Sequence, residues 1–127
     1  MNISHPPTVF KDHRGEIIDL VEKVPFSYAT IIHSEKDVER GNHYHKKTVQ
    51  YVYLLNGKLR ALSQKPGEKV ESAILNPGDL IMNEPHESHA LISLEESTFL
   101  VLTSGERGGQ NYENDTFRLE TPLSALI

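Results

Sequence analysis

Three histidines in this chain have the residue type and the spacing needed for chemistry. His43 and His45 are two positions apart, and His89 follows much later in the chain. Side chains at positions i and i+2 of a β-strand project from the same face of a sheet. If His89 lies on a strand that faces this pair, the three imidazoles converge at one point. Because imidazole is a common transition-metal ligand, the pattern predicts a site for one divalent ion.

Gln50 completes the predicted metal site as a fourth ligand. The predicted set is His43, His45, Gln50 and His89, and donors of this kind suit Zn, Ni, Fe, Co or Cu. Because none of these ligands carries a charge, the +2 charge of the ion stays uncompensated, which favours an anionic substrate. Two other interpretations stay open: the same residues line a metal-free pocket, or the histidines are hydrogen-bonded core residues. Gln50 can also lie outside a three-histidine site.

Short apolar runs separated by turn residues predict the all-β structure that must position these side chains. The expected strands span residues 8–10, 16–21, 28–33, 41–45, 50–55, 58–63, 69–75, 80–83, 88–93, 98–103 and 116–119. Asn56-Gly57 predicts a hairpin, because both residues tolerate a positive φ. Residues 65–68 and 76–79 predict Pro-Gly turns, residues 104–115 a polar loop, and residues 121–127 a terminal turn. Many short strands in 127 residues fit one β-barrel or jelly-roll domain over residues 1–127.

Composition narrows the classes of partner and compartment. The net charge of -5 at pH 7 argues against general nucleic-acid binding. The chain has no cysteine, which excludes disulfides and thiolate ligands. Its apolar runs are no longer than a strand, and its first residues lack the apolar core of a signal peptide. We therefore expect a cytoplasmic protein without a membrane segment.

The spacing of these residues resembles the two sequence motifs of the cupins, a family of small β-barrels. The first motif, G-x5-H-x-H-x3,4-E-x6-G, is matched by His43, His45, Gln50 (in place of Glu) and Gly57. The second motif, G-x5-P-x-G-x2-H-x3-N, is matched by Gly78 and His89, and the departures from the two motifs fall on Asp37, Glu84, His86 and Ser93. The resemblance covers about residues 37–93. It implies a cupin-type double-stranded β-helix, a metal held by the histidines and a homodimer.

Two further segments resemble cupins that act on sugar nucleotides. Residues 10–17 (FKDHRGEI) are similar to the F-x-D-x-R-G-x opening of dTDP-4-dehydrorhamnose 3,5-epimerases and dTDP-4-keto-6-deoxyhexose 3,4-ketoisomerases. Residues 40–46 (RGNHYHK), followed by Gln50, are similar to the R-G-x-H-A-H-K…Q segment of the ketoisomerases. This resemblance implies that His43 and His45 are an acid and a base in a metal-free site. It also implies that Arg14 contacts a phosphate across a dimer interface, the alternative being a surface ion pair.

Other side chains are candidates for the surroundings of the pocket. Arg60 and Lys46 are expected at its mouth, since basic groups there would bind phosphate or carboxylate. Arg60 faces solvent if the strand has the other parity, and Lys46 alternatively belongs to a solvated strand end. His86, three residues before His89, is a further acid/base candidate. Tyr51 and Tyr53 should point away from Gln50 and form a packing or dimer surface.

The function predicted from these residues is that of a metal-binding cupin of carbohydrate metabolism. It would isomerise or epimerise a small anionic substrate derived from a carbohydrate. One alternative is a metal-independent sugar-nucleotide 3,4-ketoisomerase with His43 and His45 as acid and base. The other is a non-catalytic barrel that binds a small ligand. All three interpretations have a small-molecule ligand and a homodimer, and none has a nucleic acid or a membrane as partner.

Overall fold

The computed structural model describes residues 1–105 and 109–127, and its regular structure consists almost entirely of β-strands. One short α-helix and one 3-10 turn complete it. The elements in chain order are β1 (Asn2–Ser4), β2 (Thr8–Asp12), β3 (Gly15–Ile18), β4 (Tyr28–Ser34), β5 (Glu39–Tyr44), β6 (Gln50–Asn56), β7 (Leu59–Gln64), β8 (Glu71–Leu75), β9 (Leu80–Asn83), β10 (Ser88–Ser93), β11 (Ser97–Thr103), α1 (Gly109–Asn114), β12 (Phe117–Arg118) and η1 (Leu123–Leu126).

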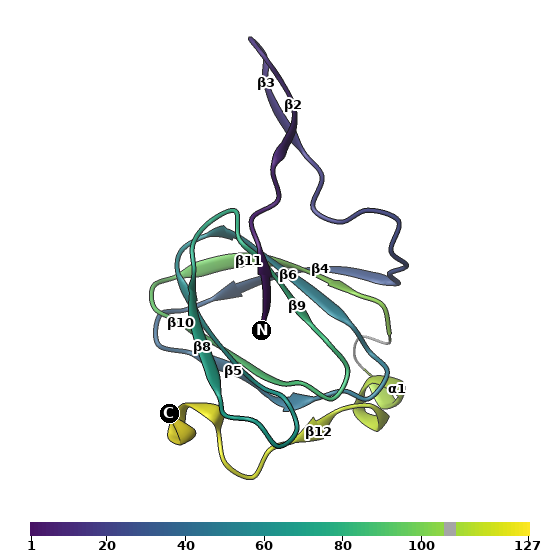
Figure 1. Cartoon of the computed structure of the whole chain (residues 1–127), viewed down its shortest axis with the longest axis vertical. Helices are drawn as coiled ribbons and strands as arrows, with labels where there is room; N and C mark the ends of the chain where they lie inside the picture. The colour runs from purple at the N-terminus through teal and green to yellow at the C-terminus, as the bar shows by residue number, and fades with distance from the viewer. Residues whose placement is uncertain (106–108) are drawn as a thin grey trace.

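The strands form two five-stranded antiparallel sheets and a separate two-stranded hairpin (Figure 1). The first sheet has the order β1-β9-β6-β11-β4, and the second has the order β12-β5-β10-β7-β8. Successive strands repeatedly change sheet, as β4 and β5, β5 and β6, and β6 and β7 do, which is the pattern of a jelly roll. The predicted all-β jelly-roll architecture is confirmed, and each strand expected from the sequence is present within a few residues.

The connection at Asn56-Gly57 is an arch between the two sheets, so the prediction of a hairpin is wrong. β6 pairs with β9 and β11, whereas β7 pairs with β8 and β10. Gly57 has a φ of 97°, and a Cβ atom there would collide with Ser97. Both kinds of turn need this backbone conformation, so the dipeptide alone does not distinguish them. Burial favours the arch over the hairpin, because Leu54 and Leu59, on either side of the turn, are both fully buried between the sheets.

The main hydrophobic core lies between the sheets and follows the alternation of the strands. Its buried members are Val52, Leu54, Leu59, Ala61, Leu75, Ile81, Phe99 and Val101. On β6 the buried residues alternate with Tyr51 and Tyr53, which are partly exposed on the other face, as the sequence predicts. A second cluster, built on Leu62, Ala90 and Leu123, packs η1 against the outer face of the second sheet. The C-terminal segment therefore closes that face.

Two regions differ from the sequence-based expectation. Residues 109–114 form helix α1 inside the segment 104–115 that was expected to be a loop, and residues 106–108 of that segment lie outside the described residues. β1 was not expected, because its three residues are too few to show a periodic pattern, and it pairs with β9 as the edge strand of the first sheet. None of the helices in the described part of the chain combines the length and the apolar character needed to cross a bilayer.

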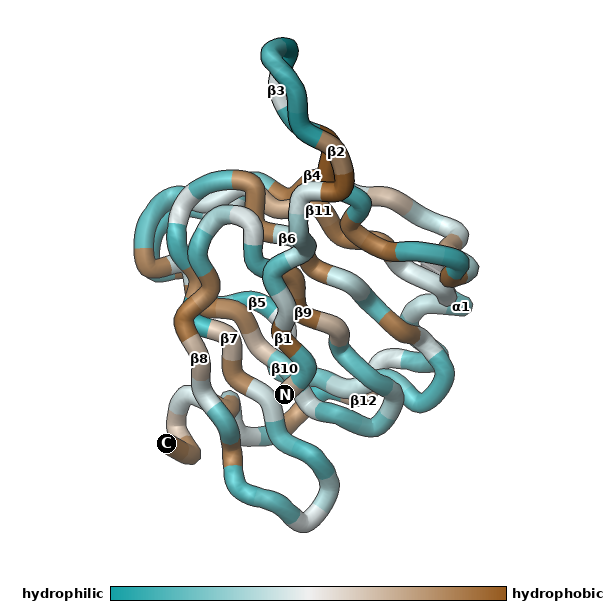
Figure 2. The backbone as a smooth tube through the Cα atoms, turned by 45° about the horizontal axis from the view of Figure 1, so that its top comes forward, coloured by the Kyte–Doolittle hydropathy of each residue, from teal (hydrophilic) through white to brown (hydrophobic). Residues whose placement is uncertain are grey.

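The β2–β3 hairpin, residues 8–18, projects away from the two sheets and is called the arm below (Figures 1 and 2). Its apolar side chains are among the most exposed of the chain, with Val9 55%, Phe10 51% and Ile17 56% accessible. A two-stranded hairpin on its own is only marginally stable in water. The arm therefore has apolar surface that the described part of this chain does not cover.

Candidate functional site

The structure brings the three predicted histidines together at one end of the second sheet. His43 lies on β5, His45 directly follows that strand, and His89 lies opposite His43 on β10. The ring centroid of His43 is 4.9 Å from that of His45 and 4.7 Å from that of His89, and the His45 and His89 centroids are 5.5 Å apart. One nitrogen from each ring lies within 4.8 Å of the others. The i, i+2 prediction of convergence is thus confirmed.

A β-bulge in β5 gives the histidines this register. The pairing of β5 with β10 shifts between His89 and Ala90, and Gly41 and Asn42 adopt positive φ values of 95° and 58°. A Cβ atom on Gly41 would lie 2.8 Å from the carbonyl oxygen of His89, a contact that only glycine avoids. Bulges re-aim side chains near functional sites. Here the bulge sets His43 directly opposite His89.

The hydrogen bonds of two imidazoles fix where their lone pairs are. His45 Nδ1 lies 2.8 Å from the carbonyl oxygen of Asp115, and His89 Nδ1 lies 3.3 Å from that of Glu87. Because a carbonyl only accepts, each Nδ1 carries the hydrogen, and each Nε2 has a free lone pair when the ring is neutral. His45 Nε2 is buried without a hydrogen-bond partner. Burial, together with nearby His43 and His45, lowers the pKa of His89 to about 3, so that this ring is neutral.

A cavity of about 210 Å³ lies beside the histidines, between the two sheets. It is lined by the polar residues Arg40, His43, Gln50, Asn83, His89 and Tyr112, and by the apolar residues Gly41, Ile32, Val52, Leu91, Phe99 and Val101. Gln50 and Asn83 face each other across β6 and β9, and both are buried. The cavity is smaller than the 300–1,000 Å³ typical of drug-sized ligands. It therefore accommodates a small polar group with one apolar side.

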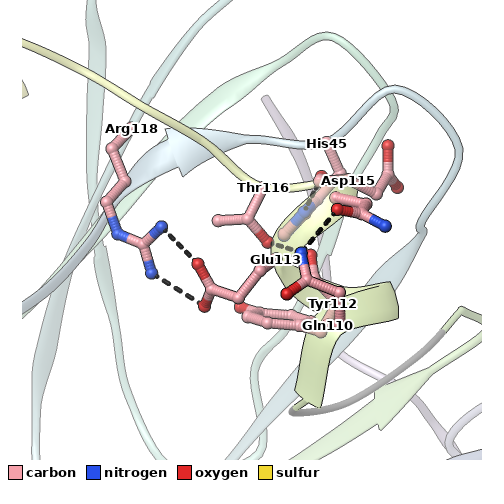
Figure 3. A network of polar contacts seen from close by, with 8 residues as sticks. His45, Gln110, Tyr112, Glu113, Asp115, Thr116 and Arg118 are labelled. Atoms are coloured by element: carbon pink, nitrogen blue, oxygen red, sulfur yellow. Dashed lines mark hydrogen bonds and ion pairs between the residues drawn. The ribbon is translucent and has the colours of Figure 1, made fainter.

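Helix α1 and the residues after it close the cavity on one side. The ring of Tyr112 lies 5.6 Å from that of His45 and also lines the cavity. Figure 3 shows His45 next to Asp115, and the guanidinium of Arg118, on the other side of the segment, is paired to Glu113 at 2.8 and 3.0 Å. This ion pair lies on the exposed side of the segment. It lowers the pKa of Glu113 and raises that of Arg118.

The side chain of Asp115 holds the loop that follows His45. Its carboxylate accepts hydrogen bonds of 2.8 to 3.3 Å from the backbone amides of Lys46, Lys47 and Thr48 and from the Thr48 hydroxyl. Burial raises the pKa of Asp115, but these hydrogen bonds outweigh it and lower the pKa to about 2. The carboxylate is therefore ionised at neutral pH, and it leaves none of the three amides of the turn unpaired.

Several predicted binding residues are not brought to the cavity, and Arg60 is the clearest correction. Its neighbours Leu59 and Ala61 face the core between the sheets, so Arg60 lies on the outer face of β7, where its Nη1 donates to Ser72 at 3.1 Å. Lys46 lies outside as well, because its Nζ is 4.4 Å from the centre of the Phe117 ring. For Arg60 the period-two alternation of β7 turns the side chain away from the interior, whereas Lys46 lies in the bend after β5.

His86 and Arg14 also lie apart from the cavity. The imidazole of His86 is exposed beside Lys46 and Tyr44, and its contribution to the site is a backbone N–H that donates to the His45 carbonyl at 2.6 Å. Its φ of 68° turns the ring outward. Arg14 is at the tip of the arm, where its guanidinium is held by Asp12 at 2.7 and 2.9 Å. The surface ion pair considered for Arg14 is thus present within this chain.

Sequence reasoning did not place three polar residues, Arg40, Tyr112 and Asn83, in the lining of the cavity. Arg40 is part of the RGNHYHK segment, but its position before the bulge was not recognisable without the register of β5. Tyr112 lies in the segment expected to be a loop, where it had no periodic signal. Asn83 ends β9, and only the pairing of β9 with β6 places it opposite Gln50. Placing these residues in the cavity requires the register between strands, which cannot be read from the sequence.

Comparisons with known proteins agree with this fold. No family model and no curated protein sequence matches the chain. Among solved structures, a 3,4-ketoisomerase from Helicobacter canadensis has a TM-score of 0.76 and 24% sequence identity, with 93% of this chain and 90% of that chain covered. The sugar 3,4-ketoisomerase QdtA from Thermoanaerobacterium thermosaccharolyticum, in complex with TDP, has a TM-score of 0.74 and 24% identity, with 94% and 89% covered.

A more distant match belongs to a second activity. The dTDP-6-deoxy-D-glucose-3,5-epimerase RmlC from Legionella pneumophila Philadelphia 1, in complex with dTDP-4-keto-L-rhamnose, has a TM-score of 0.73 and 17% identity, with 92% of this chain and 71% of that chain covered. Both kinds of protein were named by the resemblance of residues 10–17 and 40–46. The predicted structural likeness to sugar-nucleotide cupins is therefore confirmed at the level of the fold, a cupin-type jelly roll.

Proposed function

We propose that this protein is an isomerase or epimerase that moves a proton on a ketone-bearing sugar derivative, with a sugar nucleotide as the first substrate class to consider. The observation that carries the proposal is the buried, unpaired Nε2 of His45. A buried lone pair without a hydrogen-bond partner costs free energy, and a bound ligand that interacts with it would remove that cost. It lies next to cavity-lining His43 and within ring contact of Tyr112. The ketoisomerase and epimerase activities of the structural neighbours support the same reaction class.

The chemistry needs only proton transfers between groups of this kind. A neutral imidazole removes the proton from the carbon next to the ketone, and the electron pair of that C–H bond forms the C=C bond of an enediol while an acid protonates the ketone oxygen. Return of the proton to the former ketone carbon, with loss of the proton from the neighbouring hydroxyl, moves the ketone. Return of the proton to the opposite face of the carbon that lost it, with loss of the proton from the former ketone oxygen, inverts the configuration of that carbon. We assign the role of base to His45 and that of proton carrier to His43. Tyr112 is assigned the role of the acid that protonates the ketone oxygen. Atoms and electrons balance without an added oxidant or reductant.

The lining of the cavity supports an anionic sugar derivative as substrate. Arg40, whose Nε donates to Ser34 at 3.0 Å, is the cationic side chain of the lining, and it replaces the Arg60 of the sequence-based prediction. Gln50 and Asn83 offer amide groups for hydroxyls, and the apolar wall suits a carbon face of a sugar ring. A nucleotide is larger than the cavity, so its phosphates and base would lie at the opening, near Arg40.

Deuterium incorporation tests the reaction class. The protein is incubated in D₂O with TDP-4-keto-6-deoxyglucose, and with sugar phosphates and uronates, and NMR locates the deuterium. We expect exchange at a carbon next to the ketone; exchange with movement of the ketone indicates an isomerase, and exchange with inversion indicates an epimerase. His45→Asn should abolish the exchange, and exposed His33→Asn should not. Absence of exchange with every substrate would contradict the proposal.

A divalent metal bound by the same histidines is the second candidate, and the donor set fits it. Each of His45 and His89 donates its Nδ1–H to a main-chain carbonyl, as metal-bound histidines usually do, and leaves Nε2 as the ligand atom. Two nitrogens at about 2.1 Å from one ion lie no more than about 4.2 Å apart, so a span of 4.8 Å has to contract slightly. Gln50 lines the same cavity as a possible fourth donor. A bound ion would stabilise the negative charge that develops on the ketone oxygen.

Metal content and its dependence on the ligands separate the two candidates. Protein purified without chelator is analysed for Zn, Ni, Fe, Co and Cu, and the exchange reaction is repeated after chelation and after each metal is restored. Near-stoichiometric metal that is lost in both His43→Ala and His89→Ala, with activity that returns on reloading, supports the metal-dependent form. Full activity of a metal-free preparation contradicts it and leaves the histidines as the proton carriers.

We further propose that two copies of the chain form a homodimer through the arm. The apolar residues Val9, Phe10 and Ile17 are exposed. If each arm packs against the other chain of a symmetric dimer, these side chains are buried in both copies. Arg14 at the tip of such an arm reaches the partner molecule. The resemblance of residues 10–17 implies a phosphate contact there. In this arrangement each cavity would be completed by the partner's arm.

Subunit mixing tests the shared site. Arg14→Ala and His45→Asn are each expected to be poorly active as pure proteins. If Arg14 acts in the partner's site, equal amounts of the two variants, unfolded and refolded together, form mixed dimers with one intact site, and about a quarter of wild-type activity returns. Activity no higher than the sum of the two variants would contradict exchange of the arm. Light scattering that finds a monomer at micromolar concentration would contradict the dimer itself.

A further inference from the structure

Asp115 contacts the histidine site through both its main chain and its side chain. The carbonyl oxygen accepts the Nδ1–H of His45 at 2.8 Å. The carboxylate accepts from all three backbone amides of residues 46–48, which directly follow His45. The Thr48 hydroxyl adds a further bond of 2.8 Å. One residue therefore holds the imidazole and the chain that carries it (Figure 3).

The same segment anchors Tyr112. The carbonyl oxygen of Tyr112 accepts from the backbone N–H of Asp115 at 3.1 Å and from the Thr116 hydroxyl at 2.6 Å. On the other side of the site, the backbone N–H of His86 holds the carbonyl of His45 at 2.6 Å. His45 is thus fixed from both sides by main-chain groups. The relative position of His45 and Tyr112 is set through residues 112–116.

We propose that Asp115 is a positioning residue, which holds His45 in the Nδ1–H tautomer and at a fixed separation from Tyr112 without touching the substrate. The inference rests on the proposed role of His45 as a proton carrier. The tautomer depends on the contact with the Asp115 carbonyl, and that contact depends on the carboxylate keeping residues 46–48 against the C-terminal end of α1. In the other tautomer Nε2 carries a hydrogen and has no lone pair for the substrate.

The chain offers a matched pair of substitutions. Asp115→Asn keeps the shape of the side chain but replaces one acceptor oxygen by an NH₂ group, which faces the amides of residues 46–48 as donor against donor. Glu113→Gln is the control: among the described residues the hydrogen bonds of this carboxylate go to Arg118 on the exposed side, and its charge also acts on His43, so the amide keeps the side-chain shape while that weaker influence is removed. Asp115→Ser is the second variant, since its short hydroxyl accepts fewer of these bonds. If one of the two Asp115 variants fails to fold, the other one is sufficient to test the proposal.

The first measurement is the ¹⁵N NMR of the histidine rings after chelation, which is independent of turnover. We expect a single Nδ1–H tautomer for His45 in the wild type and in Glu113→Gln, and an averaged signal of both tautomers in Asp115→Asn. An unchanged His45 signature in a folded Asp115 variant would overturn the proposal. This result stands whether or not a substrate is turned over, so the failure of the proposed function and the failure of this inference are distinguishable.

The second measurement is steady-state kinetics on the substrate found by deuterium exchange. A misplaced base lowers the rate of the chemical step, so kcat should fall about 10- to 100-fold in Asp115→Asn while KM changes less than about threefold. Glu113→Gln should keep both values. A change in KM alone, with kcat preserved, would overturn the positioning role and point to substrate contact.

Discussion

The barrel interior and the arm present opposite exceptions to the rule that polar groups face water and apolar groups are buried. In the interior, buried His45 has a lone pair without a partner, although its Nδ1 and its carbonyl oxygen both have hydrogen-bond partners. In the arm, Phe10 and Ile17 are exposed, although apolar side chains of this size usually fill a core. Each exception indicates a missing component. The unpaired nitrogen of His45 suits a bound substrate or ion, and the exposed apolar side chains of the arm suit a second protein chain.

The two regions also differ in what holds them. The site is fixed by residues that are distant in sequence, since β5, β10 and the segment after α1 all contribute to it. In the described part of the chain, the hydrogen bonds of the arm are its own strand pairing and local bonds such as Arg14 to Asp12. A change in the interior should therefore alter chemistry, and a change in the arm should alter association. The following predictions test whether the two regions separate in this way.

The largest effect is expected from His45→Asn. Asparagine removes the imidazole base, and loss of a general base typically costs about 10²- to 10⁴-fold in rate. We expect turnover, or deuterium exchange, to fall by that factor while the dimer stays intact. Rate measurements and light scattering on the same sample test both halves. A dimer that dissociates in His45→Asn would show that the interior and the interface are coupled.

The next effect concerns the arm. Phe10→Ser together with Ile17→Ser removes two large apolar side chains, each of which contributes about 1.5–3 kcal/mol when fully buried. The dimer dissociation constant should rise by at least about 100-fold, and analytical ultracentrifugation measures it. The barrel should remain folded, because neither residue belongs to the core clusters of the described chain. An unchanged dissociation constant would place the interface elsewhere, for instance on the face with Tyr51 and Tyr53.

Two arginines give a smaller contrast between the inside and the outside of the barrel. Arg40 lines the cavity, whereas Arg60 lies on the outer face of β7. Arg40→Ala should raise KM for an anionic substrate about tenfold, since hydrogen bonds to charged groups contribute about 1.5–3 kcal/mol. Arg60→Ala should change KM less than about twofold. Equal effects of the two substitutions would mean that the substrate extends over the outer face, and steady-state kinetics with added salt distinguishes the cases.

The sequence was sufficient to predict the features that follow from the regular geometry of the strands. The two-residue period of the strands predicts that His43 and His45 share a face, and the motif spacing predicts that His89 joins them, because both depend on local geometry. Asp115 and Tyr112 could not be predicted in the same way. Their role depends on how the C-terminal segment returns to β5, and hydrogen bonds between a carboxylate and backbone amides leave no pattern in the residue types. Long-range packing decides such contacts.

The inward or outward direction of single basic residues was equally hard to predict. The Asn56-Gly57 turn suggested a hairpin, but the chain changes sheet there, and the register that places Leu59 inside and Arg60 outside follows from this change. A shift of one residue in a strand exchanges its two faces. The residue spacing therefore predicts the convergence of the histidines correctly, whereas Arg60, which was expected at the mouth of the pocket, lies on the outer face of β7. The arm was expected as two strands, which is confirmed, but nothing in its residue types predicted that it projects from the barrel (Figure 1).

The smallest expected effect compares the two carboxylates whose hydrogen bonds hold these regions, Asp115 and Asp12. Hydrogen bonding to Arg14 lowers the pKa of Asp12 below its usual 3.8, but its partner Arg14 is exposed and the pair is a surface ion pair, so we expect its contribution to stability to be negligible. The pKa of Asp115 is lowered to about 2. A lowered pKa means that the stabilisation is present above pH 3.8 and is lost as the pH falls toward 2. Because Asp115 is itself partly exposed, the stabilisation should be on the order of 1 kcal/mol or less after solvent screening.

Urea denaturation from pH 6 down to about pH 2.5 tests this difference. The gap in unfolding free energy between the wild type and Asp115→Asn should be constant at neutral pH and should narrow below about pH 4, because there the unfolded wild-type chain takes up a proton at Asp115 while the native carboxylate, with its pKa of about 2, is still ionised. Asp12→Asn should follow the wild type at every pH. A gap for Asp115→Asn that stays constant into acid would mean that the bonds to residues 46–48 do not require the charge. In that case a neutral oxygen acceptor holds the loop equally well, and the difference between the interior and the arm is one of geometry alone.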